Sequence, residues 1–200
     1  MFSFLRKYSS SPPSTDSINK NQDFTSQDEV LHSVNPEKGE KGICSQMANL
    51  FTKYQISCGS PDFLKGSPEE IYKASLQERR HQEELFAKGE DGLHSAFVDC
   101  KTPYFSSNNQ LKVSDLNEES LPKLVSDTRP HYLVTYPIKN TDQFHQVAFG
   151  KTKKGTCYSF SANFPPKEHS CDSFNDIVEE MHKLGDEDSY VTVAVAHGKK

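Results

Sequence analysis

The stretch Gly42-Ile43-Cys44-Ser45-Gln46-Met47-Ala48-Asn49-Leu50-Phe51 is the part of the chain around which the other segments are interpreted. Apolar residues recur after Cys44 at spacings of three and four, which predicts a helix from Cys44 to about Gln55 with one face in the core. The thiol then lies at a helix N-terminus, where unpaired N–H groups and the helix dipole favour a thiolate. Such a cysteine is a candidate nucleophile, and the alternative is a small buried hydrophobic residue.

Length and composition restrict the class of protein. The chain has 200 residues, enough for one domain with a sizeable core, and only 34% are hydrophobic, so we expect polar loops or a flexible arm outside that core. The net charge of −5 argues against a general nucleic-acid-binding protein. No apolar run approaches the roughly 20 residues of a membrane span. We expect no metal, no cofactor and a monomer.

Cysteine usage gives a prediction about the redox compartment. The five cysteines form no CxxC pair and are odd in number; they are Cys44, Cys58, Cys100, Cys157 and Cys171. We therefore expect neither a zinc cluster nor a complete disulfide framework. The chain is interpreted as an enzyme that works in a reducing cytosol.

The chain is predicted to consist of an arm and one domain. Residues 1–26 have a short apolar start and a Ser/Pro-rich continuation, which is typical of a flexible N-terminal arm. The apolar part is too short for a Sec signal peptide. Residues 27–198 are predicted to form a single domain, mainly helical over 27–129 and built on a β-sheet over 130–198.

Within that domain, local signals predict several elements. Ser67-Pro68-Glu69-Glu70 predicts the capped start of a helix that runs to Ala87. Runs rich in β-branched and aromatic residues predict strands at 131–138, 144–150, 156–161 and 189–196. We expect loops at 106–109 and 163–166, and a helix from 172 or 173 to 184.

A cysteine nucleophile requires a general base, and eight histidines compete for that role. His145 is favoured because it begins a strand directly after a turn, where a side chain projects into a cleft from a rigid frame. Strand alternation and a hairpin around residues 151–155 place Ser161 near His145. Ser161 is then a candidate acceptor for the ring N–H, and the alternative is an ordinary strand serine.

Three segments resemble the YopT-like cysteine peptidases, a papain-like group found among bacterial effectors that are injected into host cells. The segments are 42–47, which resembles the nucleophile motif, 144–149, which resembles the histidine strand, and 158–164, which resembles the following segment that usually carries Asp-Pro-Asn. The order of the later helix and strand is also similar. The resemblance covers about 42–58 and 131–196 and leaves the arm and the middle of the chain unmatched.

The resemblance implies an α+β, papain-like fold, in which an N-terminal helical lobe with the cysteine helix packs on a C-terminal antiparallel sheet. It implies Cys44 and His145 as catalytic residues, with Ser161 at the position where the family places its Asp. A serine holds the histidine tautomer but stabilises an imidazolium less than a carboxylate does. Asn163 is the second candidate to orient the ring, since papain-like enzymes often use Asn.

Such an enzyme also needs an oxyanion hole, and the sequence offers candidate donors for it. The Cys44 backbone N–H is the first donor, and a side-chain amide of Asn35 or Gln46 is the second. Asn35 is favoured because it lies upstream in a loop.

For function, the resemblance implies a protease that a bacterium secretes into the host cell cytoplasm without a Sec signal. Its partner is a host protein substrate, with ubiquitin chains as a leading candidate. Two other functions stay open: a transglutaminase or deamidase that uses the same thioester chemistry on a Gln side chain, and a non-catalytic binding module with Cys44 packed away.

Overall fold

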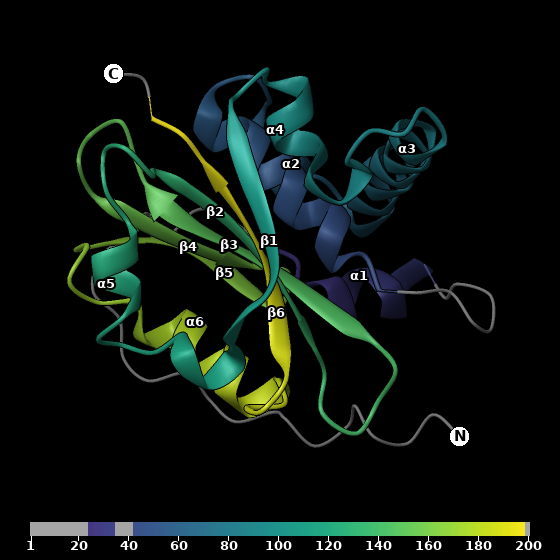
Figure 1. Ribbon diagram of the computed structural model, residues 1–200. Coiled ribbons are helices and arrows are strands. Elements are labelled where there is room, and N and C mark those ends of the chain that lie inside the picture. Colours follow the sequence, from purple (N-terminus) through teal and green to yellow (C-terminus); the bar gives the residue numbers. More distant parts are fainter. Residues whose placement is uncertain (1–23, 35–41, 199–200) are drawn as a thin grey trace.

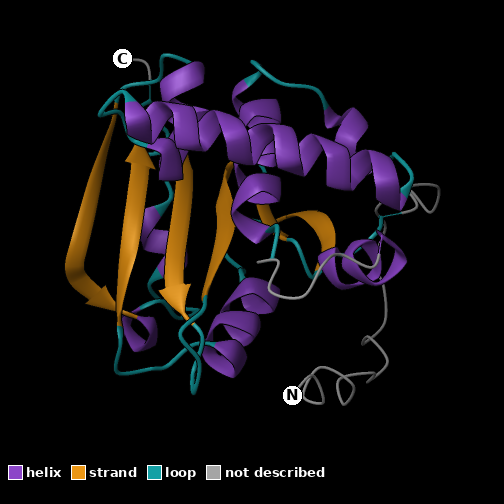
Figure 2. Cartoon of the chain, turned by 90° about the vertical axis from the view of Figure 1, so that its right-hand side faces the viewer, coloured by secondary structure: helices purple, strands orange, loops and turns teal. Residues whose placement is uncertain are grey.

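The computed structural model describes residues 24–34 and 42–198, and these form an antiparallel sheet with helices on both faces (Figure 1). The helices on one face are α1 (Gln27–Val34), α2 (Cys44–Ile56), α3 (Pro68–Ala87) and α4 (Ser95–Asp99). The other face carries α5 (Leu121–Leu124) and α6 (Asn175–Leu184). Figure 2 shows the same layers from the side. None of the described helices has the length and apolar character needed to cross a membrane.

The sheet has six strands in the described part of the chain, in the order β1-β6-β2-β3-β4-β5. The strands are β1 (Tyr104–Lys112), β2 (His131–Pro137), β3 (Phe144–Lys151), β4 (Cys157–Ser161), β5 (Phe164–His169) and β6 (Tyr190–Ala196). Strand β3 lies between β2 and β4, with Tyr136 opposite His145 and Ala148 opposite Phe160. The predicted fold class, α+β with the cysteine helix packed on an antiparallel sheet, is confirmed.

Alternation along the central strands produces two cores, one on each face of the sheet. Ala148 and Phe160 face α2, where the Phe51 ring stacks on Phe160 with centroids 4.4 Å apart. Val147 and Phe149 face α6 and belong to the second core. The odd-numbered positions of β3 and β4 therefore point to the α6 face, and this places the side chains of His145 and Ser161 there.

Several predicted elements are confirmed, and two predicted loops are wrong. Helix α2 begins at Cys44, and α3 begins at Pro68 behind a capping box of Ser67 and Glu70. Residues 106–109, expected to be a loop, lie inside β1, and residues 164–166 of the second expected loop, 163–166, lie inside β5. Both are edge strands with polar or proline residues, which an edge tolerates because one side of its backbone needs no partner strand. The sheet thus takes β1 from the part expected to be mainly helical.

The boundary of the predicted N-terminal arm falls beside a packed segment. The Phe24 ring lies edge-on to Phe160, with centroids 6.3 Å apart, and the Ser26 hydroxyl accepts a hydrogen bond from the Glu29 N–H at the start of α1. Residues 1–23 lie outside the described residues, so the division into an arm and one domain stays a prediction.

The cysteine prediction is wrong. All five cysteines lie in the described residues, and four are paired, Cys58 with Cys100 and Cys157 with Cys171, which leaves Cys44 as the free thiol. Pairs separated by 42 and 14 residues carry no sequence signal, because their contact depends on how α2 meets α4 and how β4 meets the loop before α6. Disulfides persist in oxidising compartments, so they oppose the expectation of a reducing cytosol.

We expect reduction to lower the free energy of unfolding, because each disulfide restricts the unfolded chain. The loss is about 2–4 kcal/mol per bond, and it is larger for Cys58–Cys100, which closes the longer loop. Thermal unfolding of the oxidised protein and of paired Cys→Ser variants at each disulfide measures this order. Equal melting temperatures with and without reductant would contradict these pairings.

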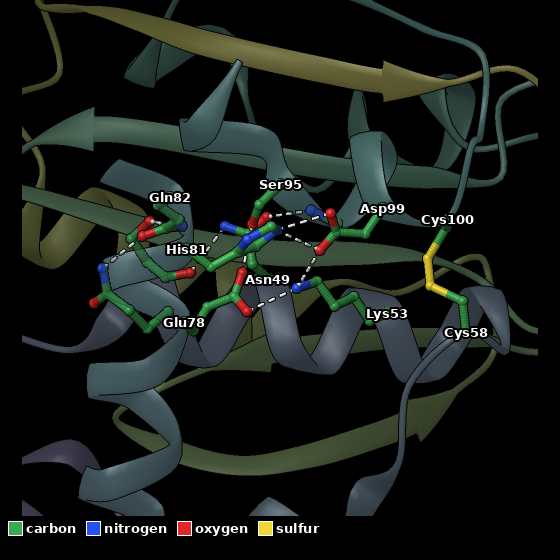
Figure 3. Close-up of polar contacts among 12 residues, drawn as sticks. Asn49, Lys53, Cys58, Glu78, His81, Gln82, Ser95, Asp99 and Cys100 are labelled. Carbon is green, nitrogen blue, oxygen red and sulfur yellow. Dashed lines mark hydrogen bonds and ion pairs between the residues drawn. A yellow bond between two sulfur atoms is a disulfide. The ribbon is translucent and has the colours of Figure 1, made fainter. Parts of the chain in front are cut away.

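Buried Asn49, labelled in Figure 3, lies on α2 and connects this helix to β3 and to the chain before α4. Its Nδ2 donates to the Gln146 Oε1 and to the Leu93 carbonyl, each at 3.0 Å, and its Oδ1 accepts from the Ala96 N–H at 3.0 Å. Further along α2, the Lys53 ammonium binds carboxylates of α3 and α4. These bonds fix the position of the cysteine helix against the sheet.

Replacing Asn49 by alanine should destabilise the fold by about 3 kcal/mol, because the buried partners of the amide lose their hydrogen bonds. In a chain of this length that corresponds to a fall of roughly 6–12 °C in melting temperature. Asn108→Ala is the matched control, since Asn108 is exposed on β1. Similar melting temperatures for the two variants would show that the Asn49 contacts do not hold the fold.

Candidate active site

Cys44 is the first residue of α2, and it lies against the start of β3. Strand β4 pairs with β3 only from Ala148 onward, so the first residues of β3 have no β4 partner in the backbone ladder. The Cys44 Sγ lies there, 3.8 Å from the Phe144 carbonyl oxygen, and the Gln146 N–H also donates to it. The thiol therefore contacts the peptide groups on both sides of His145.

The Cys44 side chain is 8% exposed, and its burial controls its ionisation. Burial raises the pKa of the Cys44 thiol above its ordinary value, while backbone N–H groups of Gln146, Ser45 and Cys44 act in the lowering direction. The expectation that the helix start favours a thiolate is wrong for this geometry, because desolvation outweighs those donors. The thiol is neutral here and donates to the Phe144 carbonyl.

His145 reaches the α6 face of the sheet, where the structure places Ser161. The His145 Nε2 lies 3.1 Å from the Ser161 Oγ, and the ring is edge-on to Tyr136, with centroids 5.6 Å apart. Burial lowers the pKa of His145 to about 4, so the ring is neutral at pH 7.

Ser161 joins His145 to a carboxylate that sequence reasoning missed. The Ser161 Oγ donates to the Glu180 Oε1 at 2.8 Å and accepts from the Asn163 backbone N–H at 3.2 Å. The Glu180 Oε1 is itself 3.6 Å from the His145 Nε2. Since the hydroxyl has one proton and gives it to Glu180, the histidine Nε2 must carry the proton in its bond to Ser161. This leaves Nδ1 unprotonated in the neutral ring.

Glu180 comes from α6 and is 8% exposed. Its Oε1 also accepts from the Asn163 Nδ2 at 2.6 Å, and its Oε2 has no hydrogen-bond partner within the described residues. Burial raises the pKa of Glu180 to about 7, although bonds from Ser161 and Asn163 act to lower it. A sequence signal existed: position 180 belongs to the same apolar stripe as Ile177 and Met181, and a Glu in that stripe is unusual.

Gln27, from α1, forms the outer side of the cluster and was also missed. Its backbone N–H donates to the Ala162 carbonyl and its Nε2 donates to the Asn163 Oδ1, each at 2.7 Å. Its Oε1 is buried without a partner among the described residues, and a side chain at Gly42 would meet that oxygen at 3.2 Å. Gln27 thus lies between Asn163 and the segment that leads into Cys44.

The remaining predicted residues have different surroundings. Gln46 turns to α3, where its Nε2 donates to the Gln82 Oε1 at 2.7 Å in a buried contact. The Asn163 side chain contacts Glu180 and Gln27, so Ser161 is the residue against the His145 ring. Asn35 lies outside the described residues.

Similarity to known proteins is found at the level of the three-dimensional structure. No family model and no curated protein sequence matches the chain. The structure is similar to the avirulence protein AvrPphB of Pseudomonas, with a TM-score of 0.52 and 12% identity over 84% of this chain and 93% of that one. It also matches PatoxP, a cysteine protease-like domain of the Photorhabdus asymbiotica toxin PaTox, with a TM-score of 0.48 and 18% identity over 87% of this chain and 52% of that one. The likeness to AvrPphB confirms the expected YopT-like, papain-like fold.

Proposed function

We propose that the chain is a cysteine protease that hydrolyses peptide or isopeptide bonds in a protein substrate. Cys44 is the nucleophile, His145 is the general base and Ser161 orients the histidine. The observation that supports this most strongly is the contact of a free thiol at a helix start with the backbone on both sides of a histidine whose Nε2 is held by Ser161. A pair of this kind is the minimum that thiol-based acyl transfer requires.

We propose the following reaction, in which the Nδ1 of His145 is the proton acceptor because its Nε2 is bonded to Ser161. Cys44 gives its proton to the unprotonated Nδ1 of His145, and the sulfur attacks the substrate carbonyl carbon. The C–N bond breaks as the imidazolium gives that proton to the leaving amine, and an acyl thioester remains. Water attacks the thioester and gives one proton to His145, the C–S bond breaks, and that proton returns to the sulfur. The Cys44 backbone N–H is the proposed first oxyanion donor.

The substrate is proposed to be a host protein, with ubiquitin chains as the leading candidate. AvrPphB is an avirulence protein, which supports the proposal of a bacterial effector that is secreted into the host cytoplasm. The host cytoplasm is reducing, so this setting requires the fold to survive the loss of both disulfides.

A ubiquitin C-terminal electrophile tests the substrate. We expect a covalent adduct with the wild type and none with Cys44→Ala, together with cleavage of at least one ubiquitin linkage. Cys44-dependent cleavage of another host protein without reaction toward ubiquitin would remove the deubiquitinase proposal and keep the protease. A gain of one dalton on a Gln side chain would identify a deamidase instead.

A further inference from the structure

The candidate histidine has a carboxylate beside it, although the position where the YopT-like peptidases carry Asp is a serine here. Ser161 accepts from the His145 Nε2–H at 3.1 Å and donates to the Glu180 Oε1 at 2.8 Å, so the three side chains form one continuous hydrogen-bonded chain. We propose that Glu180 is the anionic positioning residue of the site and acts on His145 through the Ser161 hydroxyl. This inference rests on the proposed function of Cys44 and His145.

In the hydrogen bonds that link His145, Ser161 and Glu180, each donor and acceptor can be assigned. An ionised carboxylate only accepts, so Ser161 donates to Glu180, and its lone pairs then accept from His145 and from the Asn163 N–H. Glu180 therefore fixes the orientation of the Ser161 hydroxyl, and the hydroxyl fixes the histidine tautomer that leaves Nδ1 for the thiol. A serine without this carboxylate would be free to donate to the ring and favour the opposite tautomer.

Charge is the second contribution of Glu180. When His145 takes the thiol proton it becomes an imidazolium, and the Glu180 Oε1 lies 3.6 Å from its Nε2 in a site that is almost dry. A negative charge at that distance stabilises the imidazolium, which a neutral serine does only weakly. The helix α6 thus supplies the carboxylate that the strand position lacks.

Neighbouring side chains hold the Glu180 carboxylate in place through hydrogen bonds. Asn163 donates to its Oε1 at 2.6 Å, and Gln27 in turn holds the Asn163 amide at 2.7 Å. Ser161 on β4, Asn163 after β4 and Lys183 on α6 act to lower the pKa of Glu180. The Glu180 charge in turn raises the pKa of Cys44 on α2 and of Tyr136 on β2, and its Oε1 lies 3.6 Å from His145 on β3.

The pH dependence follows from the sign of the Glu180 shift. Burial raises the pKa of this carboxyl to about 7, so below pH 7 it is protonated and stabilises the imidazolium weakly. Above pH 7 it is ionised, and at 3.6 Å from the His145 Nε2 it favours the imidazolium that forms on proton transfer from Cys44, an effect that must exceed the rise that the same charge produces in the pKa of Cys44. The reactivity of Cys44 should therefore rise as pH increases through about 7.

Alkylation of Cys44 by iodoacetamide tests this without a known substrate. In the oxidised protein Cys44 is the free cysteine, so the intact mass reports its modification directly. We compare the wild type, Glu180→Gln and the double variant Glu180→Gln/Ser161→Asp between pH 5 and 9, with Glu179→Gln as the control from the exposed side of α6. Glu180→Gln should slow alkylation about tenfold at pH 8 and remove the rise near pH 7. The double variant, with a carboxylate restored next to the ring, should recover the rate to within about threefold.

The outcomes separate this inference from the proposed function. If His145→Gln slows alkylation but Glu180→Gln matches the wild type, the inference is overturned and the protease proposal stands. If Glu180→Gln is slow and the double variant does not recover, Glu180 has only a packing role and the inference is also overturned. If His145→Gln leaves the rate unchanged at every pH, the proposed function itself fails.

Discussion

Replacing Cys44 by alanine is expected to remove hydrolysis completely, a fall of at least ~10⁴-fold in kcat/KM. The reason is chemical: the acyl thioester cannot form without the sulfur, and Cys44 is the free thiol among the five cysteines. Turnover of a cleaved host protein, or adduct formation with a ubiquitin electrophile, measures the effect.

Ser45→Ala is the matched control for this variant, because Ser45 occupies the next position on α2 and its hydroxyl accepts a long bond, 3.3 Å, from Gln82. It should retain activity to within a few fold. Equal activity of Cys44→Ala and the wild type would exclude Cys44 as the nucleophile.

Replacing His145 by glutamine is expected to lower kcat/KM by about 10³-fold, within the usual contribution of a general base. Glutamine keeps a polar side chain against Ser161 but cannot take the thiol proton. Hydrolysis and Cys44 alkylation, measured on the same preparation, should fall together. A variant that keeps wild-type kcat/KM would assign the base to another residue.

The shifted pKa values of His145 and Glu180 also make the free energy of unfolding depend on pH. The pKa of His145 is lowered to about 4, so alone it makes the fold less stable as pH falls from 6.5 toward 4, where the unfolded chain takes up the proton first. The pKa of Glu180 is raised to about 7, so alone it makes the fold less stable as pH rises from 4.5 toward 7. In the wild type the two slopes oppose each other.

When one of the two residues is replaced, the free energy of unfolding should show the pH dependence of the residue that remains. His145→Gln should lose stability as pH rises to 7, and Glu180→Gln should lose it as pH falls to 4, by about 3 kcal/mol each. Urea unfolding at several pH values measures both. Parallel slopes in the two variants would mean that the groups do not titrate as a buried pair.

The residues that the sequence could identify are those linked by local geometry. Cys44 is marked by the helix pattern that begins at it, and α2 does begin there. His145 and Ser161 are on adjacent strands of one hairpin, so strand alternation alone predicts that they lie on one face, and their side chains are 3.1 Å apart.

The residues that the sequence could not identify reach the site through tertiary packing. Glu180 and Gln27 come from α6 and α1, and no spacing in the chain shows that these helices meet Ser161 and Asn163. Burial also reversed the expected ionisation of Cys44, because the depth of a thiol in the fold is not a local property. The edge strands β1 and β5 were missed since an edge strand lacks the apolar alternation of a central one.

The most direct test of the protease proposal is mass spectrometry of peptide termini and ubiquitin linkages in a host lysate treated with the wild type or with Cys44→Ala. The account predicts new termini or lost isopeptide linkages in the wild-type sample that are absent from the Cys44→Ala sample. Identical termini and linkages in the two samples would contradict it.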